Sequence, residues 1–169
     1  MAVLVSVIQK KNSKLAKHGM RIREATTEDL RKLTVLVSEL FAIESDFKPN
    51  VRKQRQGLAY LMECEQATVL VMDLNHEIIG MCTLQPLIST AEGGTVGMVE
   101  DLIVAEAWRG QGLGTQLLNA VEAVALAQGM SRLQLLAGRG NAEAQLFFDK
   151  QQWQKTNMRV RRKKLSLPT

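Results

Sequence analysis

The sequence predicts a single α/β domain built on a mixed β-sheet of about six or seven strands, flanked by about four helices. Three observations favour this fold class. Strand-like and helix-like stretches alternate along most of the chain, a glycine-rich run separates a strand from a long helix, and 169 residues at 46% hydrophobic content suit one core. We expect the domain to span 20–169, after an N-terminal extension at 1–19 that is either disordered or packed on a neighbouring surface.

The domain begins with a strand and two helices. Residues 20–25 alternate between apolar and polar side chains, as a half-buried strand does. Thr26 and Asp29 then form a capping-box pattern, and leucines and other apolar residues recur at helical spacing after them. A second helix is expected around Pro49, because proline fits the first turn of a helix.

The period then changes to that of strands. Two apolar stretches, 67–72 and 78–84, surround a short polar turn and predict a hairpin. After two glycines, residues 95–104 form the expected central strand. The first half of the sheet is therefore expected to be largely antiparallel.

The second half of the chain predicts a parallel pair of strands. A helix at 112–128 has no proline in its interior, and Gly129 fits the position just after its end. A strand at 132–136, a shorter helix at 142–150 and one or two final strands within 153–165 complete the predicted order.

Charge and cysteine content bound the function. The net charge of +5 comes from the two ends, since residues 21–158 hold 13 Lys/Arg against 17 Asp/Glu. We therefore interpret the basic ends as solvated surface and do not expect nucleic acid as a partner. Two cysteines are too few for a disulfide framework, and we expect each to pack as a small apolar residue in a reducing, cytoplasmic location. No apolar run approaches the roughly 20 residues of a membrane span.

The most informative feature is the run 109–114, Arg-Gly-Gln-Gly-Leu-Gly. Glycines let the backbone approach an anion, and the first free N–H groups of the following helix point at it. The run lacks the Gly-Lys-Ser/Thr ending of a P-loop, and its glycine spacing does not fit the dinucleotide fingerprint. It predicts a phosphate-binding loop, the alternative being a turn that only connects two elements.

The spacing Arg-x-x-Gly-x-Gly after a strand resembles the acyl-CoA loop of the GNAT superfamily of N-acyltransferases. The element order resembles that family over about residues 20–165, most of the chain. The resemblance implies a GNAT-like fold and acetyl-CoA as the donor. No metal is expected, because the sequence lacks metal-ligand spacing. The resemblance implies that the backbone amides of Gln111, Gly112, Leu113 and Gly114 hold the CoA pyrophosphate, with Thr115 near enough to add a hydroxyl. Arg109 is expected to support this loop, and Gly110 completes the expected cofactor-binding set. The resemblance also implies that the backbone of Leu102, Ile103 and Val104 pairs with the pantetheine arm, much as a β-strand would.

Two adjacent acids, Glu100 and Asp101, stand in the central strand. Neighbouring residues on a strand point to opposite faces, so they are not expected to act as a pair, and a buried carboxylate needs a partner. The resemblance places Glu100 where many relatives hold a glutamate that activates the amine, and Asp101 is the second candidate. An alkylamine of pKa about 10.4 must lose a proton before it attacks a thioester. The alternative for both is a structural carboxylate.

The segment 141–153 resembles the family motif Asn-x-x-Ala-x-x-x-Tyr-x-x-x-Gly-Phe. It implies that Asn141 contacts the cofactor. Phe148 stands at the tyrosine position, where relatives often protonate the departing thiolate, and Gln152 stands at the glycine position. Phe148 cannot donate a proton, although it can still pack along the cofactor arm.

The sequence thus predicts an N-acetyltransferase that moves an acetyl group from acetyl-CoA to a primary amine of a small molecule or peptide. The alternative is a catalytically weak or inactive acyl-CoA-binding module, which Phe148 favours. The acids Glu39, Glu44 and Asp46 could bind a cationic amine, but a solvated helix face explains them as well. The resemblance adds a homodimer as one expected assembly.

Overall fold

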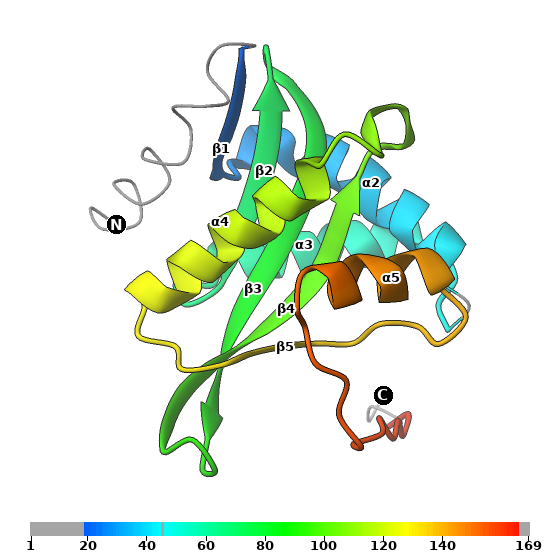
Figure 1. Ribbon diagram of the computed structural model, residues 1–169. Helices are drawn as coiled ribbons and strands as arrows, with labels where there is room; N and C mark the ends of the chain where they lie inside the picture. The colour runs from blue at the N-terminus through cyan, green and yellow to red at the C-terminus, as the bar shows by residue number, and fades with distance from the viewer. Residues whose placement is uncertain (1–18, 45, 166–169) are drawn as a thin grey trace.

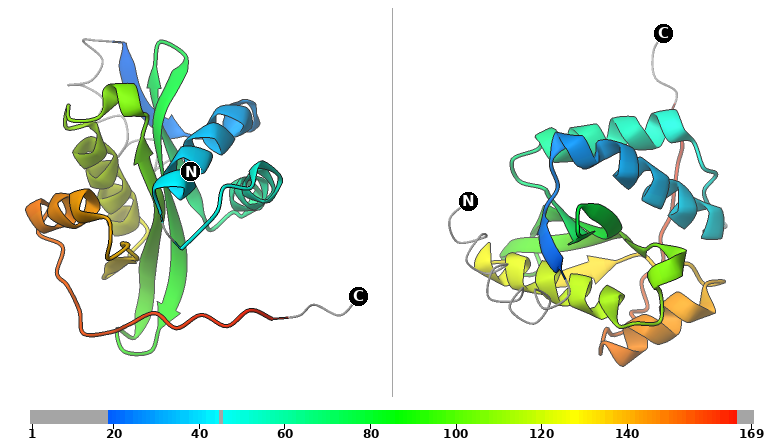
Figure 2. Two further views of the ribbon diagram at one scale, coloured as in Figure 1. Left: turned by 90° about the vertical axis from the view of Figure 1, so that its right-hand side faces the viewer. Right: turned by 90° about the horizontal axis from the view of Figure 1, so that it is seen from above.

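The computed structural model describes residues 19–44 and 46–165. They form one five-stranded sheet in the order β1-β2-β3-β4-β5, with α4 and α5 on one face and α2 and α3 on the other (Figure 1; Figure 2). The predicted α/β fold with a mixed sheet is confirmed, but the strand number within these residues is five rather than six or seven. The predicted extension, apart from Gly19, lies outside the described residues.

The first strand is tied to the sheet by a buried ionic network. β1 (Met20–Glu24) pairs antiparallel with β2 (Thr68–Leu74) at the sheet edge. Arg23 bonds Asp73 at 2.9 Å and Asp29 at 2.7 Å, and its hydrogen bond to Asp29 lowers the pKa of that carboxyl. Asp29 closes the predicted capping box by accepting the Thr26 backbone N–H at 2.7 Å.

Two helices cover one face of the sheet. The short 3₁₀ turn η2 (Thr27–Asp29) leads into α2 (Leu30–Ile43), and α3 (Val51–Glu63) packs beside it. Asn50 caps α3 by accepting the Lys53 N–H at 3.0 Å, so Pro49 precedes the helix and the expectation that it lies in the first turn is wrong. The Asn50 side chain accepts a hydrogen bond from a free N–H of the first turn, whereas a proline in that turn would only remove an N–H.

Three long antiparallel strands form the centre. The turn at Asn75 and His76, both with positive φ, joins β2 to β3 (Glu77–Ser89), and β3 pairs along β4 (Gly94–Val104). β5 (Leu133–Leu135) pairs parallel with β4 over only three residues, Gly97–Val99. The sheet is therefore mixed, as predicted, but its last strand is short.

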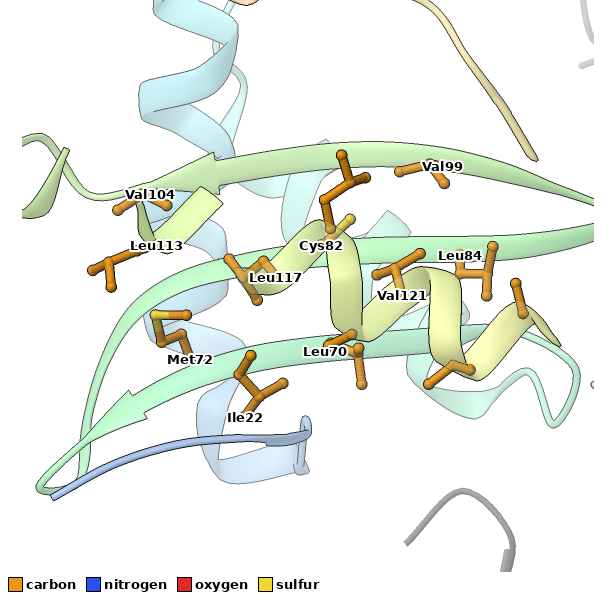
Figure 3. Close-up of a cluster of buried hydrophobic side chains, with 14 of the residues drawn as sticks. Ile22, Leu70, Met72, Cys82, Leu84, Val99, Val104, Leu113, Leu117 and Val121 are labelled. Carbon is orange, nitrogen blue, oxygen red and sulfur yellow. The ribbon is translucent and has the colours of Figure 1, made fainter. Parts of the chain in front are cut away.

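The main core lies between the sheet and α4 (Leu113–Ala127) (Figure 3). Apolar residues at helical spacing along this helix are buried: Leu113, Leu117, Leu118, Val121, Val124 and Ala125. Cys82 points into this core, whereas Cys64 is exposed, so the expectation of two buried cysteines is right only for Cys82.

The end of the chain departs most from the prediction. α5 (Ala142–Lys150) forms as expected, but residues 153–165 contain no strand. This stretch runs extended across the molecule toward the side of α2 and α3, where Arg162 lies 4.6 Å over the Phe47 ring (Figure 2). A strand needs an edge to pair with, and Met158 and Val160 are 81% and 61% exposed.

Candidate active site

One edge of β4 becomes free where the site begins. β5 leaves β4 after Val99, so among the described residues no strand pairs with 100–104 on that side. The other edge of this stretch pairs with β3 up to Val104. The side chains of Ile103 and Val104 are buried in the core and Leu102 is half-buried. Whatever binds here would meet backbone N–H and C=O groups, as a peptide-like ligand requires.

A bulge interrupts β4 at the predicted carboxylates. Met81 pairs with Ile103 and Thr83 with Glu100, so the single residue between them on β3 faces two residues on β4. Asp101 takes the left-handed conformation with φ of 49°. Bulges of this kind leave a residue unpaired and re-aim side chains, often next to active sites.

The bulge gives the two acids different surroundings. Glu100 is exposed, and its Oε2 accepts the Gln85 amide at 3.2 Å. Asp101 is partly buried; burial and then the negative charge of Glu100 raise its pKa to about 6, against an opposing hydrogen bond from Thr83. A carboxyl of this pKa is half-ionised near pH 6 and mostly ionised at neutral pH, so it is available there to accept a proton.

The glycine run forms a tight turn between β4 and α4. After the short 3₁₀ turn η3 (Glu106–Trp108), Arg109 folds back, and its Nε donates to the Val104 carbonyl at 2.9 Å. Gly110 and Gly112 have φ of 75° and 77°, and a Cβ at either position would point into open space. Among the residues that the structure describes, no side chain caps the start of α4, so its first N–H groups have no side-chain acceptor there. The turn therefore fits an anion such as a pyrophosphate.

Helix α5 reaches the glycine turn through aromatic side chains. A Cβ on Gly114 would lie 3.5 Å from the Phe147 ring. Phe148 packs edge-on against Phe147 at 5.1 Å between centroids and against Trp153 at 5.8 Å. Phe148 is thus held in an aromatic cluster beside the predicted cofactor loop.

Asn141 starts α5 and has both ends of its amide engaged. Its Oδ1 accepts the Ala144 N–H at 3.0 Å, and its Nδ2 donates to Glu44 Oε1 at 3.2 Å. Glu44 lies at the end of α2, on the opposite side of the sheet from α5. This contact between two distant segments has no signal in the sequence.

The structure gathers the predicted residues along one path. Asp101 and the free edge of β4 lead to Arg109, the glycine turn and the first turn of α4, where Thr115 is half-buried. Sequence reasoning missed Thr83 and the bulge, since alternation alone shows only a regular strand. Among the described residues, no group of three or more His, Cys, Asp or Glu side chains could hold a metal ion, and no helix combines the length and apolar character needed to cross a membrane.

Comparison with known proteins identifies the class. The described residues form an α/β domain in which a glycine turn joins a strand with an unpaired edge to the start of a helix. The family model described as Acetyltransferase (GNAT) family matches residues 37–152, more than half of the chain. The chain therefore belongs to the GNAT acetyltransferase family, whose fold uses acetyl-CoA and whose members act on amines.

Individual proteins resemble this chain in sequence or in fold. The aminoalkylphosphonate N-acetyltransferase of Salmonella typhimurium is 26% identical over 138 residues, covering 82% of this chain and 87% of the relative. The structure of a possible acetyltransferase from Clostridium difficile superposes with a TM-score of 0.78 at 14% identity, covering 88% of this chain and 99% of that one. A predicted acetyltransferase of Clostridium acetobutylicum, solved with acetyl-CoA, has a TM-score of 0.70 at 16% identity, covering 85% and 96%.

Proposed function

We propose that this protein transfers the acetyl group of acetyl-CoA directly to a primary amine of a small molecule or peptide. The amine nitrogen forms a bond to the thioester carbonyl carbon, and the bond from that carbon to sulfur breaks. The proton lost by the amine goes to a carboxylate or a water, and the thiolate takes a proton from solvent. The donor supplies an activated acyl carbon, and the residues of this chain orient it and manage the protons.

One observation carries the proposal: the unpaired edge of β4 at 100–104 is followed, after the short turn η3, by the glycine turn 109–114. An arm that carries amides can bond this edge while its pyrophosphate meets the first N–H groups of α4. Arg109 would act on the turn itself, since its Nε already bonds the Val104 carbonyl. A backbone N–H near Val104 could donate to the oxyanion that forms at the carbonyl, an effect typically of a few kcal/mol.

Two carboxylates are candidates for the base. The family motif favours Glu100, which is exposed and bonded to Gln85. The geometry favours Asp101, which lies at the bulge and whose pKa is raised to about 6 by burial and by the charge of Glu100. We assign proton acceptance to Asp101, directly or through a water, and leave Glu100 the role of raising that pKa by its charge.

The second candidate function is an acyl-CoA-binding module with little or no turnover. The observation that favours it is Phe148, which lies in an aromatic cluster and has no proton to give. A thiol of ordinary pKa near 8.5 leaves tolerably as the thiolate, however, so the missing acid slows transfer without preventing it.

We propose that the acceptor is an amine that is either simply cationic or also bears an anionic group. Glu39 and Glu44 are half-buried on α2, which would suit a cationic amine, whereas Arg162 lies beside Phe47 on the same side of the sheet. The Salmonella relative is named for an aminoalkylphosphonate, an amine that also bears an anion. A panel of amines should therefore include polyamines, peptides and aminoalkyl phosphonates.

The test is release of free CoA from acetyl-CoA across this panel, with donor binding measured separately by calorimetry. Saturable release with at least one amine is the expected result. Saturable binding without release for any amine would favour the binding module, and absence of donor binding would contradict both functions.

We further propose a homodimer as the assembly. The outer edge of β5 has no partner strand among the described residues, and the exposed side chains of Met158 and Val160 lie in an unpaired segment. Light scattering during gel filtration is expected to give twice the mass of 18.8 kDa. A monomer at micromolar concentration would contradict this proposal.

A further inference from the structure

We propose that Glu44 is a positioning residue that sets where α5 begins and thereby the affinity for the acyl-CoA donor. Its carboxylate joins the end of α2 to the start of α5 through the 3.2 Å hydrogen bond with Asn141. The proposal rests on the proposed function, because it assumes that the donor binds between β4 and α5.

Phe147 and Phe148 pack against the core farther along α5, but the start of this helix has few other contacts. β5 ends at Leu135, and residues 136–141 have no strand partner. Within α5 no residue is fully buried. The connecting segment is held by Gln145, whose amide lies 3.3 Å from the Gly138 carbonyl, and by Asn141, whose N–H bonds that carbonyl at 3.1 Å. These contacts are all local, so they fix the shape of the turn and not its distance from β4.

Glu44 supplies a hydrogen bond to the start of α5 that is not local. Residues 44 and 141 are 97 positions apart, and they come from opposite faces of the sheet. A hydrogen bond to a charged group is stronger than one between neutral groups. Glu44 is half-buried, so solvent weakens this bond only in part. The first turn of α5, which includes Asn141, is therefore located by a carboxylate on another element.

The backbone at Gly138 makes room for this carboxylate. A Cβ at Gly138 would lie 2.5 Å from Glu44 Oε2, closer than real contacts allow. Gly138 is not in the left-handed region, so alanine is compatible with its backbone. Gly138→Ala would therefore push the Glu44 side chain away without straining the turn, and it gives a second way to break the same contact.

The experiment measures acetyl-CoA binding by calorimetry and steady-state kinetics in the full chain. We expect Glu44→Ala to raise Kd and KM for acetyl-CoA about three- to tenfold, the loss of one partly exposed charged hydrogen bond, with kcat little changed. Glu44→Gln keeps an oxygen that accepts from Asn141, and it should restore most of the affinity. Glu63→Ala, at the exposed end of α3, is the matched control that removes a carboxylate at a helix C-terminus and should change neither constant.

A double-mutant cycle separates positioning from general destabilisation. Gly138→Ala should weaken donor binding as Glu44→Ala does, and the double variant should be no weaker than Glu44→Ala alone. Fully additive losses, or wild-type affinity in Glu44→Ala, would overturn the inference while the proposed function stands. A loss in Glu44→Gln equal to that in Glu44→Ala would also overturn it, because charge and not position would then matter. Failure of the wild type to bind acetyl-CoA would contradict both proposals.

Discussion

The two helices that meet at the candidate site are held in different ways. α4 buries seven side chains against the sheet, including Leu117 at 0% exposure, whereas α5 has no fully buried residue and rests on aromatic and polar contacts. The position of the glycine turn is fixed by the core under α4. The position of α5 depends on a few individual contacts. Binding of the pyrophosphate should therefore be robust, while the placement of the rest of the ligand is open to adjustment by single residues.

The largest effect is expected at the glycine turn, on the α4 side of the site. Gly112→Glu should lower the affinity for acetyl-CoA by about a hundredfold or more, because a carboxylate would lie against the pyrophosphate. Calorimetry of the purified variant measures this. Gly93→Glu is the matched control, since Gly93 also has a positive φ, of 65°, with open space at its Cβ, but lies in the β3–β4 turn. Equal loss in both variants, or retained binding in Gly112→Glu, would refute the loop assignment.

The second effect concerns the bulge in β4. Asp101→Asn should lower kcat by about 10²- to 10⁴-fold, the usual contribution of a general base, with donor affinity preserved. Glu100→Gln should have a smaller effect, and its removal of a negative charge should lower the pKa of Asp101.

The pH profile gives an independent measure of the same group. The base must be ionised, so the wild-type kcat should rise with pH through about 6 and level off above it. An unchanged profile and near wild-type kcat in Asp101→Asn would return the base to Glu100 or to water.

The difference between the two sides also explains what the sequence could predict. The buried face of α4 and the glycine turn follow from local patterns, namely helical spacing and glycine positions, and both are confirmed. The bulge at Asp101 escaped prediction because it depends on which β3 residue opposes it, a register that no local pattern contains. The bond between Glu44 and Asn141 escaped for the same reason. The expectation of strands at 153–165 was wrong because a local pattern cannot show whether the segment lies beside a free strand edge.

The third effect tests the contrast in stability. Leu117→Ala should lower the free energy of unfolding by about 2–5 kcal/mol, the usual loss for a buried leucine, and denaturant titration measures it. Leu146→Ala on α5, where the side chain is 61% exposed, should change it by less than about 0.5 kcal/mol. Similar losses in the two variants would show that α5 is anchored far more firmly than its burial indicates.

The smallest effect concerns Phe148 on α5, where a proton donor is missing. Phe148→Tyr places a hydroxyl in the aromatic cluster at the position where relatives hold a tyrosine, and it should raise kcat about two- to fivefold. The gain is limited because a thiolate of pKa near 8.5 already leaves without help. Phe147→Tyr is the matched control, since its ring lies against Gly114 and edge-on to Phe148, and it should give no gain. Stopped assays of CoA release at saturating donor compare the two. An equal gain in both variants, or none in Phe148→Tyr, would mean that the ring at 148 does not face the departing sulfur, and the proton must then come from solvent alone.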